Sequence, residues 1–324
     1  MKKYIICVWL VLMAGSIGVH AQVEKLGKVD KRVVKYTTKA NPAEVLFDYG
    51  SLSMNKDIEY ELTRHIRIKI NTEEGLSRST FNIPFNAAEG ESIIEIEGMS
   101  YTENGNGKVV KRKLNDFDNL EQELAGNFKQ ITISFPEAQE GSVVELKYKH
   151  IVGSPDRIPK WEFADNIPVK WSEYEVNLPV FHEFAVLSKK VDDFFVTAQD
   201  ESFLPHKVFI EYDEDTPVTS GSTYGSYRHF NGRVSKDALV NVKSTKYKWV
   251  LKDIPAVATE NELGPLLVLQ YNGAYEVGLD AYLQLDPSFR RFFQTAGTGN
   301  NRIISDTRAV GFRGDFSAGQ STGQ

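Results

Sequence analysis

The stretch "IEYELTRHIRIKI", residues 58–70, alternates between two kinds of side chain, and this alternation decides the fold class. In a β-strand, successive side chains point to opposite faces of the sheet. The positions in phase with Ile58 are all apolar or aromatic except Arg64, whereas the other phase is polar and charged throughout. The stretch therefore predicts a strand with one face in a core.

The polar phase of this strand carries His65, Arg67 and Lys69. Charged residues are rarely fully buried, so we expect these three to lie on a solvated face rather than in a site. Arg64 is the exception, because an unpaired guanidinium among apolar neighbours is costly. It predicts either a bulge that shifts the register or an acidic partner; a ligand-binding arginine is the remaining alternative.

The same period of two recurs along the chain. Residues 92–101 and 108–114 flank "TENGNG", whose Asn-Gly pairs suit the positive φ angles of a hairpin turn. Residues 131–136 and 143–152 predict a second hairpin. Further short strands are expected at 174–178, 208–212 and 245–251, and helices at 116–123 and 275–285. Strands this frequent predict a mainly β protein, an antiparallel β-sandwich with few short helices.

The N-terminus carries an export signal. Lys2 and Lys3 precede the apolar run 4–13, and small residues follow up to Ala21. This pattern predicts a signal peptide over residues 1–21, cleaved before Gln22. The run is shorter than the roughly 20 residues that span a bilayer, so no transmembrane segment is expected after cleavage. The expected location is the periplasm or the cell exterior.

Composition excludes several functions for the mature chain. The only cysteine, Cys7, lies in the signal segment, which excludes thiolate nucleophiles, disulfides and cysteine-ligated zinc. Without Lys2 and Lys3, 36 basic and 44 acidic residues give a net charge of −8. No basic block is present, so nucleic acid is not an expected partner.

No motif in the sequence indicates a catalytic residue, a set of metal ligands or a cofactor. "GQSTG" at 319–323 fits the nucleophile-elbow pattern, but only three residues follow Ser321, which leaves no room for the helix that the elbow needs. The histidines do not form a close pair suited to zinc. His150 is in phase with an apolar face, and we expect it to be a hydrogen-bonded core residue.

The strongest binding candidates are four aromatic residues close together in sequence: Trp161, Phe163, Trp171 and Tyr174. Exposed aromatics of this kind stack on sugar rings or grip peptides. The alternative is that they fill the core, as large aromatics mostly do. Their solvent exposure distinguishes the two interpretations.

Four ordered segments carry a family resemblance: "HIRIKINTEEG" at 65–75, "FPEAQEGSVVELKYKHIVGSP" at 135–155, "WEFADNIPVKWSEYEVNLP" at 161–179 and "WVLKDIPAVATENE" at 249–262. Together they resemble the secreted domain of unknown function that precedes transglutaminase-like domains in Bacteroidota proteins. The resemblance implies a mostly β N-terminal domain exported to the periplasm or cell surface. A transglutaminase-like triad needs a cysteine, and none occurs after Cys7, so no nucleophile can be assigned.

The C-terminal part differs in composition. Residues 253–324 contain five arginines and no lysine, although the chain has lysine throughout its earlier part. We therefore divide the chain into a signal peptide (1–21), a β-sandwich domain (22–262) and an atypical tail (263–324). The tail could result from a truncation or frameshift, or it could be a native extension. The segment "GPLLVLQYNGAYEVGLDAYLQL" within it could form a strand and a helix.

Two functions are expected from these observations. The first is a noncatalytic accessory or interaction domain whose partner is an envelope protein, peptide or glycan. The second is a thiol-independent hydrolase that uses carboxylates and histidine on envelope glycans or peptides. A cleft with converging Glu, Asp and His side chains would favour the hydrolase.

Overall fold

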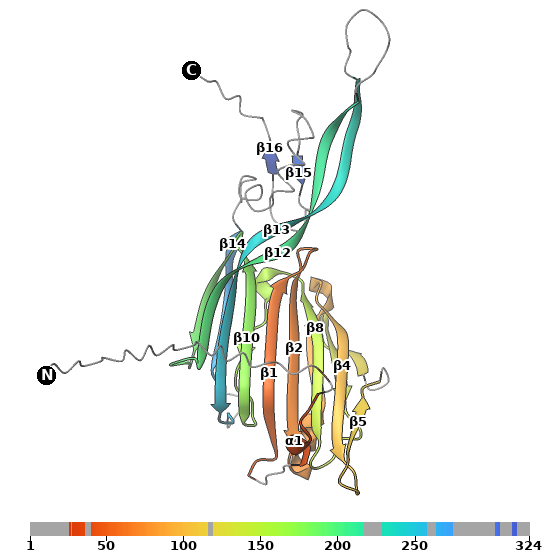
Figure 1. Cartoon of the computed structure of the whole chain (residues 1–324), viewed down its shortest axis with the longest axis vertical. Helices are drawn as coiled ribbons and strands as arrows, with labels where there is room; N and C mark the ends of the chain where they lie inside the picture. Colours follow the sequence, from red (N-terminus) through yellow and green to blue (C-terminus); the bar gives the residue numbers. More distant parts are fainter. Residues whose placement is uncertain are drawn as a thin grey trace, which may run out of the picture.

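The computed structural model describes residues 26, 28–35, 40–115, 119–216, 229–257, 264–274, 302–304 and 313–315. These residues form one ten-stranded sheet and two three-stranded sheets, with one five-residue α-helix and three short 3-10 helices (Figure 1). The predicted fold class, mainly β with antiparallel sheets and few short helices, is confirmed. No helix among these residues is long and apolar enough to cross a membrane.

The large sheet has the strand order β16-β15-β12-β13-β10-β1-β2-β8-β4-β5. All neighbours are antiparallel except β1 and β10, which are parallel. The strands are β1 (Ala43–Met54), β2 (Tyr60–Ile70), β4 (Ser92–Glu103), β5 (Val109–Lys113), β8 (Val143–Val152), β10 (Val169–Pro179), β12 (Val196–Thr216), β13 (His229–Ile254), β15 (Arg302–Ile304) and β16 (Arg313–Asp315).

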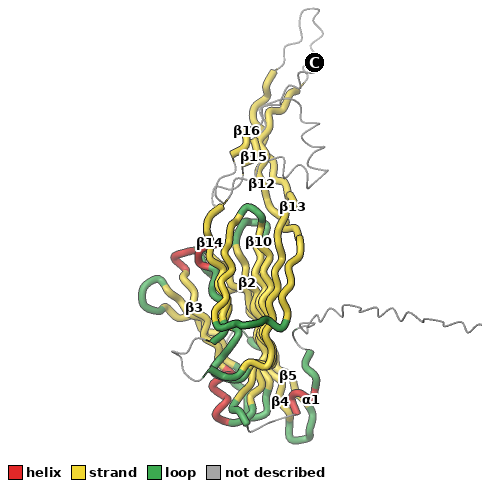
Figure 2. Tube along the Cα trace, turned by 90° about the vertical axis from the view of Figure 1, so that its left-hand side faces the viewer, coloured by secondary structure: helices red, strands yellow, loops and turns green. Residues whose placement is uncertain are grey.

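Two separate three-stranded sheets face this large sheet. One has the order β3-β7-β6, and the other β11-β14-β9. Their strands are β3 (Thr80–Asn86), β6 (Asn119–Glu123), β7 (Phe128–Ser134), β9 (Trp161–Glu162), β11 (His182–Lys189) and β14 (Leu266–Ala274). Figure 2 shows β3 and β14 on one side of the large sheet, and α1 (Lys31–Lys35) on the other.

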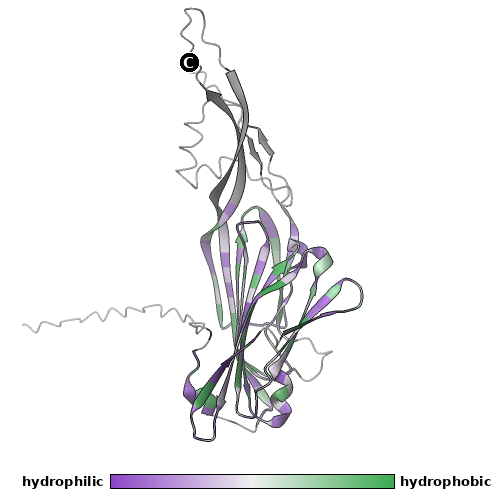
Figure 3. Cartoon of the chain, turned by 90° about the vertical axis from the view of Figure 1, so that its right-hand side faces the viewer, coloured by the Kyte–Doolittle hydropathy of each residue, from purple (hydrophilic) through white to green (hydrophobic). Residues whose placement is uncertain are grey.

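A single apolar cluster fills the space between the layers. It includes Ile66 and Leu146 of the large sheet, Ile83 and Ile133 of one small sheet, and Leu267 of the other. Ile68 and Ile70 of the opening stretch are fully buried there. In Figure 3, hydrophobic and hydrophilic residues alternate along the strands of the body, as the period of two requires.

The hairpin expected around "TENGNG" forms between β4 and β5. The Asn104 side chain accepts hydrogen bonds from the backbone N–H groups of Asn106 (3.2 Å) and Lys108 (2.9 Å). Gly107 takes a φ of 69°, which a residue with a Cβ adopts only with strain. The turn chemistry read from the sequence is therefore confirmed.

Two predicted elements were wrong. Residues 119–123, expected in a helix, form strand β6 at the edge of the β3-β7-β6 sheet. The expected hairpin between residues 131–136 and 143–152 does not form, because β7 pairs with β3 and β6, whereas β8 pairs with β2 and β4. Phe135, buried and packed on Phe81, lies where the chain crosses from one layer to the other.

Three further expectations concern the later part of the chain. The segments at 174–178, 208–212 and 245–251 lie within β10, β12 and β13. The β12–β13 pair continues to Thr216 and His229, beyond the last β10–β13 partners, and forms the long arm at the top of Figure 1. Leu266–Ala274, inside the segment that we assigned to the tail, forms β14; the helix expected at 275–285 lies outside the described residues.

Candidate binding cleft

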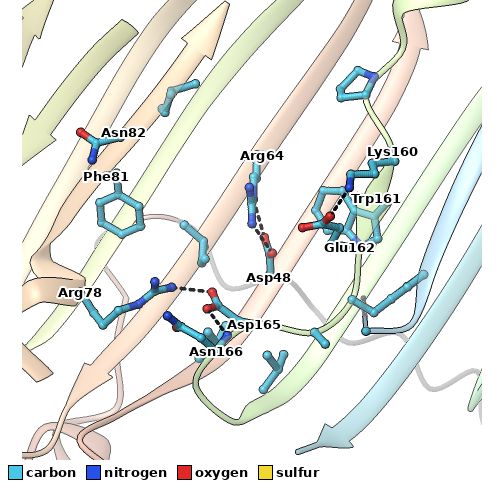
Figure 4. Close-up of a pocket in the computed structure, with 18 of the residues that line it drawn as sticks. Asp48, Arg64, Arg78, Phe81, Asn82, Lys160, Trp161, Glu162, Asp165 and Asn166 are labelled. Carbon is cyan, nitrogen blue, oxygen red and sulfur yellow. Dashed lines mark hydrogen bonds and ion pairs between the residues drawn. The ribbon is translucent and has the colours of Figure 1, made fainter. Parts of the chain in front are cut away.

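A cleft of about 750 Å³ lies between the large sheet and the two small ones. Its floor is formed by β1, β2 and β8, one wall by Thr80–Pro84 of β3, and the other wall by residues 159–166, which include β9. This volume is in the range of sites that bind small molecules or peptide segments. Figure 4 shows Phe81 and Asn82 on one side of the cleft, and Lys160, Trp161 and Glu162 on the other.

Arg64 and Asp48 form a two-pronged ion pair on the floor of the cleft. The Arg64 Nε donates to Asp48 Oδ1 at 2.9 Å, and Nη2 donates to Oδ2 at 2.6 Å. The Asp48 side chain is 8% exposed and that of Arg64 35% exposed. Of the explanations that the sequence left open for Arg64, the acidic partner is correct. Asp48 comes from β1, 16 residues earlier in the chain, which is why local pattern did not reveal the pair.

A second ion pair links the two walls. Arg78, at the end of η1 (Glu73–Ser79), donates through Nη2 to Asp165 Oδ2 at 2.5 Å. The partners lie 87 residues apart and come from the segments that lead into β3 and out of β9. Lys160 and Glu162 form a further pair at 2.6 Å, with both side chains about half exposed. All six charged side chains of these pairs have a partner of opposite sign.

Trp161 forms part of the wall and is only 4% exposed. Its ring stacks on Tyr174 at a centroid distance of 4.9 Å, with the planes 2° apart, and its Nε1 donates to Ser172 Oγ at 3.2 Å. Gly50 allows this position, because a Cβ there would lie 2.4 Å from the indole ring. The Arg64 guanidinium lies 5.4 Å from the ring centroid. Trp161 is thus a fixed wall residue, with its ring packed inside the protein.

The structure brings three of the four aromatic candidates to the same side of the large sheet. Phe163 lines the cleft, is 1% exposed and packs on Phe194, and Tyr174 lies beneath Trp161. Trp171 is on the opposite face of β10, where its Nε1 donates to Glu173 at 2.9 Å and its ring meets Phe195.

His150 is the one histidine that lines the cleft among the described residues. Its Nε2 lies 3.3 Å from a carboxylate oxygen of Glu91, so the expected hydrogen bond is present, but the side chain is 12% exposed and lines the cleft rather than the core. Burial lowers the pKa of His150 below its usual value, although the Glu91 charge opposes this shift. Among the described residues, no group of three His, Cys, Asp or Glu side chains could hold a metal ion.

The opposite face of β2 holds a second charged cluster, and here the sequence prediction was wrong. His65, Arg67 and Lys69, which we expected in solvent, are at most 5% exposed. The Glu145 carboxylate of β8 accepts hydrogen bonds from Tyr101 (2.5 Å) and Arg67 (2.7 Å) and lies 2.8 Å from His65 Nε2. We call these five residues the Glu145 cluster.

The cover of this cluster comes from the N-terminal segment 28–35. Arg67 donates to the carbonyl oxygen of Lys28 at 3.1 Å, and Lys69 Nζ donates to that of Val34 at 2.6 Å. Burial raises the pKa of the Glu145 carboxyl, but the hydrogen bonds from His65 and Tyr101 and the charge of Arg67 outweigh burial and lower it. Alternation cannot reveal a cover that is supplied by residues 35 to 39 positions away.

Part of the chain resembles a known family. Residues 56–193 match the family model of DUF3857, a domain of unknown function. This range contains the floor strand β2, both cleft walls and Glu145. No curated protein matches the chain.

A solved structure from Parabacteroides distasonis ATCC 8503, described as a "putative protease", aligns with 70% of this chain at 15% identity and a TM-score of 0.46. The present chain spans 40% of the length of that protein.

Proposed function

We propose that this chain is a noncatalytic accessory domain that binds another macromolecule through the cleft. The observation that carries the proposal is the state of the charged side chains that line the cleft. Asp48, Asp165 and Glu162 each form an ion pair with an arginine or lysine side chain, and His150 is in contact with Glu91. Carboxylates held in this way are poorly placed to donate or abstract a proton, whereas fixed ion pairs give a binding site its shape.

The sequence supports a role in the cell envelope. The predicted signal segment favours export to the periplasm or the exterior, and the four ordered segments resemble the domain that precedes transglutaminase-like domains. We infer that the bound macromolecule is an envelope protein, peptide or glycan, and that in related proteins a neighbouring catalytic domain acts on it. Residues 22–324 contain no cysteine, so no transglutaminase-like nucleophile lies within them.

Binding without turnover is the test. Residues 22–324 are mixed with a random library of twelve-residue peptides and, separately, with peptidoglycan fragments. Fluorescence anisotropy measures binding, and mass spectrometry detects products. We expect binding to one probe class and no product. We also expect the double variant Asp48→Ala with Arg64→Ala to bind at least tenfold more weakly, because the floor of the cleft loses its fixed shape.

A matched control keeps this test specific. The double variant Glu121→Ala with Lys129→Ala removes an ion pair of 2.8 Å on the β6–β7 edge, away from the cleft. It should bind as the parent does. Equal losses in the two double variants, or no binding to either probe, would contradict the proposal.

The hydrolase remains the second candidate, because Asp48, Asp165, Glu162 and His150 do converge on the cleft. It predicts a product that appears with the parent protein and disappears with Asp48→Asn or His150→Gln. A product of that kind would replace the binding function with the catalytic one.

A further inference from the structure

The two small sheets end at the cleft with strand edges that no other described strand covers. β3 pairs only with β7, and β9 pairs only with β14, so each is the edge strand of its sheet among the described residues. Both sheets cover the same face of the large sheet, and residues of both edges line the cleft between them. An uncovered edge is a template for a further strand.

The pairing of β3 fixes which of its peptide groups face the cleft. Ser79 accepts a hydrogen bond from Phe135 N–H at 3.0 Å, and in an antiparallel pair the bonded positions recur at every second residue. Phe81 and Ile83 therefore bond to β7, while Thr80 and Asn82 turn their N–H and C=O groups away from it. Pro84 is in the same phase as Thr80 and Asn82, so the N–H that proline lacks is not one that would bond to β7.

The opposite wall has the matching arrangement. Phe163 N–H donates to the carbonyl oxygen of Pro265 at 3.0 Å, so Phe163 and Trp161 bond towards β14. Glu162, between them, turns its N–H and C=O away from β14, and it lines the cleft. Each wall thus has backbone donors and acceptors that its own sheet does not use, and residues of both walls line the same cleft.

We propose that an extended polypeptide segment binds in the cleft as a strand between β3 and β9. It would join the two small sheets into one sheet with the order β11-β14-β9-peptide-β3-β7-β6. This inference rests on the proposed binding function and names its partner as a peptide main chain. Strand addition draws affinity from main-chain hydrogen bonds and specificity from alternate side chains.

The lining of the cleft defines the chemistry of this peptide. The run Thr80–Pro84 matches about five peptide residues at roughly 3.3 Å per residue. Side chains that point to the floor meet Val45, Leu62 and Ile66, beside the Arg64–Asp48 pair. Because both charges of that pair are already compensated, an additional buried charge would have no partner, so inward side chains should be uncharged and apolar.

A glycan fits the same cleft less well. Sugar sites offer an aromatic face on which a ring can stack, but Trp161 is 4% exposed, and its ring lies against Tyr174 and Gly50. The walls also offer backbone N–H and C=O groups at Thr80, Asn82 and Glu162. Recognition of a strand uses these groups directly.

Amide hydrogen exchange tests the inference. Peptides of twelve residues are selected from the random library for binding to residues 22–324, and exchange is followed residue by residue with and without them. We expect the amides of Thr80, Asn82 and Glu162 to exchange rapidly in the free protein and to slow at least tenfold with peptide. Those of Phe81 and Ile83, already bonded to β7, should change little.

Two proline variants separate strand addition from other binding. Asn82→Pro removes an N–H that faces the cleft, and Pro84 shows that this phase accepts proline. Glu121→Pro removes a backbone N–H on β6, the far edge strand of the same sheet. Leu124 N–H donates to the carbonyl oxygen of Phe128, so the N–H of Glu121, which is in the other phase of the strand, points away from β7. Peptide affinity should fall at least tenfold in Asn82→Pro and stay unchanged in Glu121→Pro, with circular dichroism confirming that both fold.

The outcomes distinguish this inference from the function on which it rests. Strand addition would be overturned by peptides that need the Asp48–Arg64 pair but bind equally to both proline variants. It would also be overturned by peptides that protect none of the three amides. Either result would leave the proposed binding function intact. Binding of peptidoglycan fragments alone would overturn it in favour of a glycan. Failure of both probes would overturn the proposed function as well.

Discussion

The two faces of β2 carry charge in opposite ways. On one face, Arg64 meets Asp48 as a single pair at the floor of an open cleft. On the other face, the single carboxylate of Glu145 is hydrogen-bonded to His65, Arg67 and Tyr101 beneath the N-terminal segment. A paired charge near solvent can form part of a binding surface at low energetic cost, whereas a shared buried charge commits its neighbours to one arrangement.

The largest effect should come from the carboxylate of the Glu145 cluster. Glu145→Gln removes the negative charge that lies 2.7 Å from the buried Arg67 guanidinium. Breaking a buried ion pair by removing one partner costs roughly 3 to 5 kcal/mol. We expect urea denaturation to show a loss of this size in the free energy of unfolding.

The exposed pair of Glu121 with Lys129 gives the control for this variant. Glu121→Gln should change the free energy of unfolding by less than about 0.5 kcal/mol. A Glu145→Gln protein as stable as this control would show that the two faces of β2 do not differ in the way described.

Lys69 should make the free energy of unfolding depend on pH in the alkaline range. Burial lowers the pKa of Lys69 from 10.5 to about 8. Between these two values the unfolded chain holds a proton that the folded protein has released, so the free energy of unfolding rises with pH. Across that window the gain should be on the order of 2 to 3 kcal/mol.

Lys69→Met removes this titration and keeps a buried aliphatic side chain. The difference in unfolding free energy between parent and variant, measured by urea denaturation at pH 7.5, 9 and 10.5, should increase in favour of the parent. A difference that stays constant with pH would mean that Lys69 titrates in the folded protein as it does in the unfolded chain.

The smallest effect should come from the cleft pair. Arg64 is 35% exposed, and ion pairs that solvent reaches contribute about 1 kcal/mol or less. A double-mutant cycle with Asp48→Asn and Arg64→Gln should return a coupling energy of about 1 kcal/mol, lower at high salt. A coupling energy as large as the loss in Glu145→Gln would mean that Asp48 and Arg64 stabilise the fold rather than shape the cleft.

The outcome for individual residues shows how far pattern reasoning reached. Ile66, Ile68 and Ile70 are buried as alternation predicts, because a half-buried strand must place one phase in the core. His65 and Arg67 were placed wrongly, because alternation separates two faces without saying what covers the second one. For Arg64, the pattern identified a residue out of place but could not name Asp48 as its partner.

The mainly β class, the apolar phase of β2 and the chemistry of the turn at Gly107 could be predicted from the sequence, since these depend on neighbours within a few residues. Three features could not be predicted and appear only in the folded protein. The two small sheets stop short of each other, Arg78 and Asp165 meet across the gap, and residues 28–35 cover Glu145 and its partners. These features join segments from 35 to 87 residues apart, and such contacts depend on how the layers pack, which no local periodicity encodes.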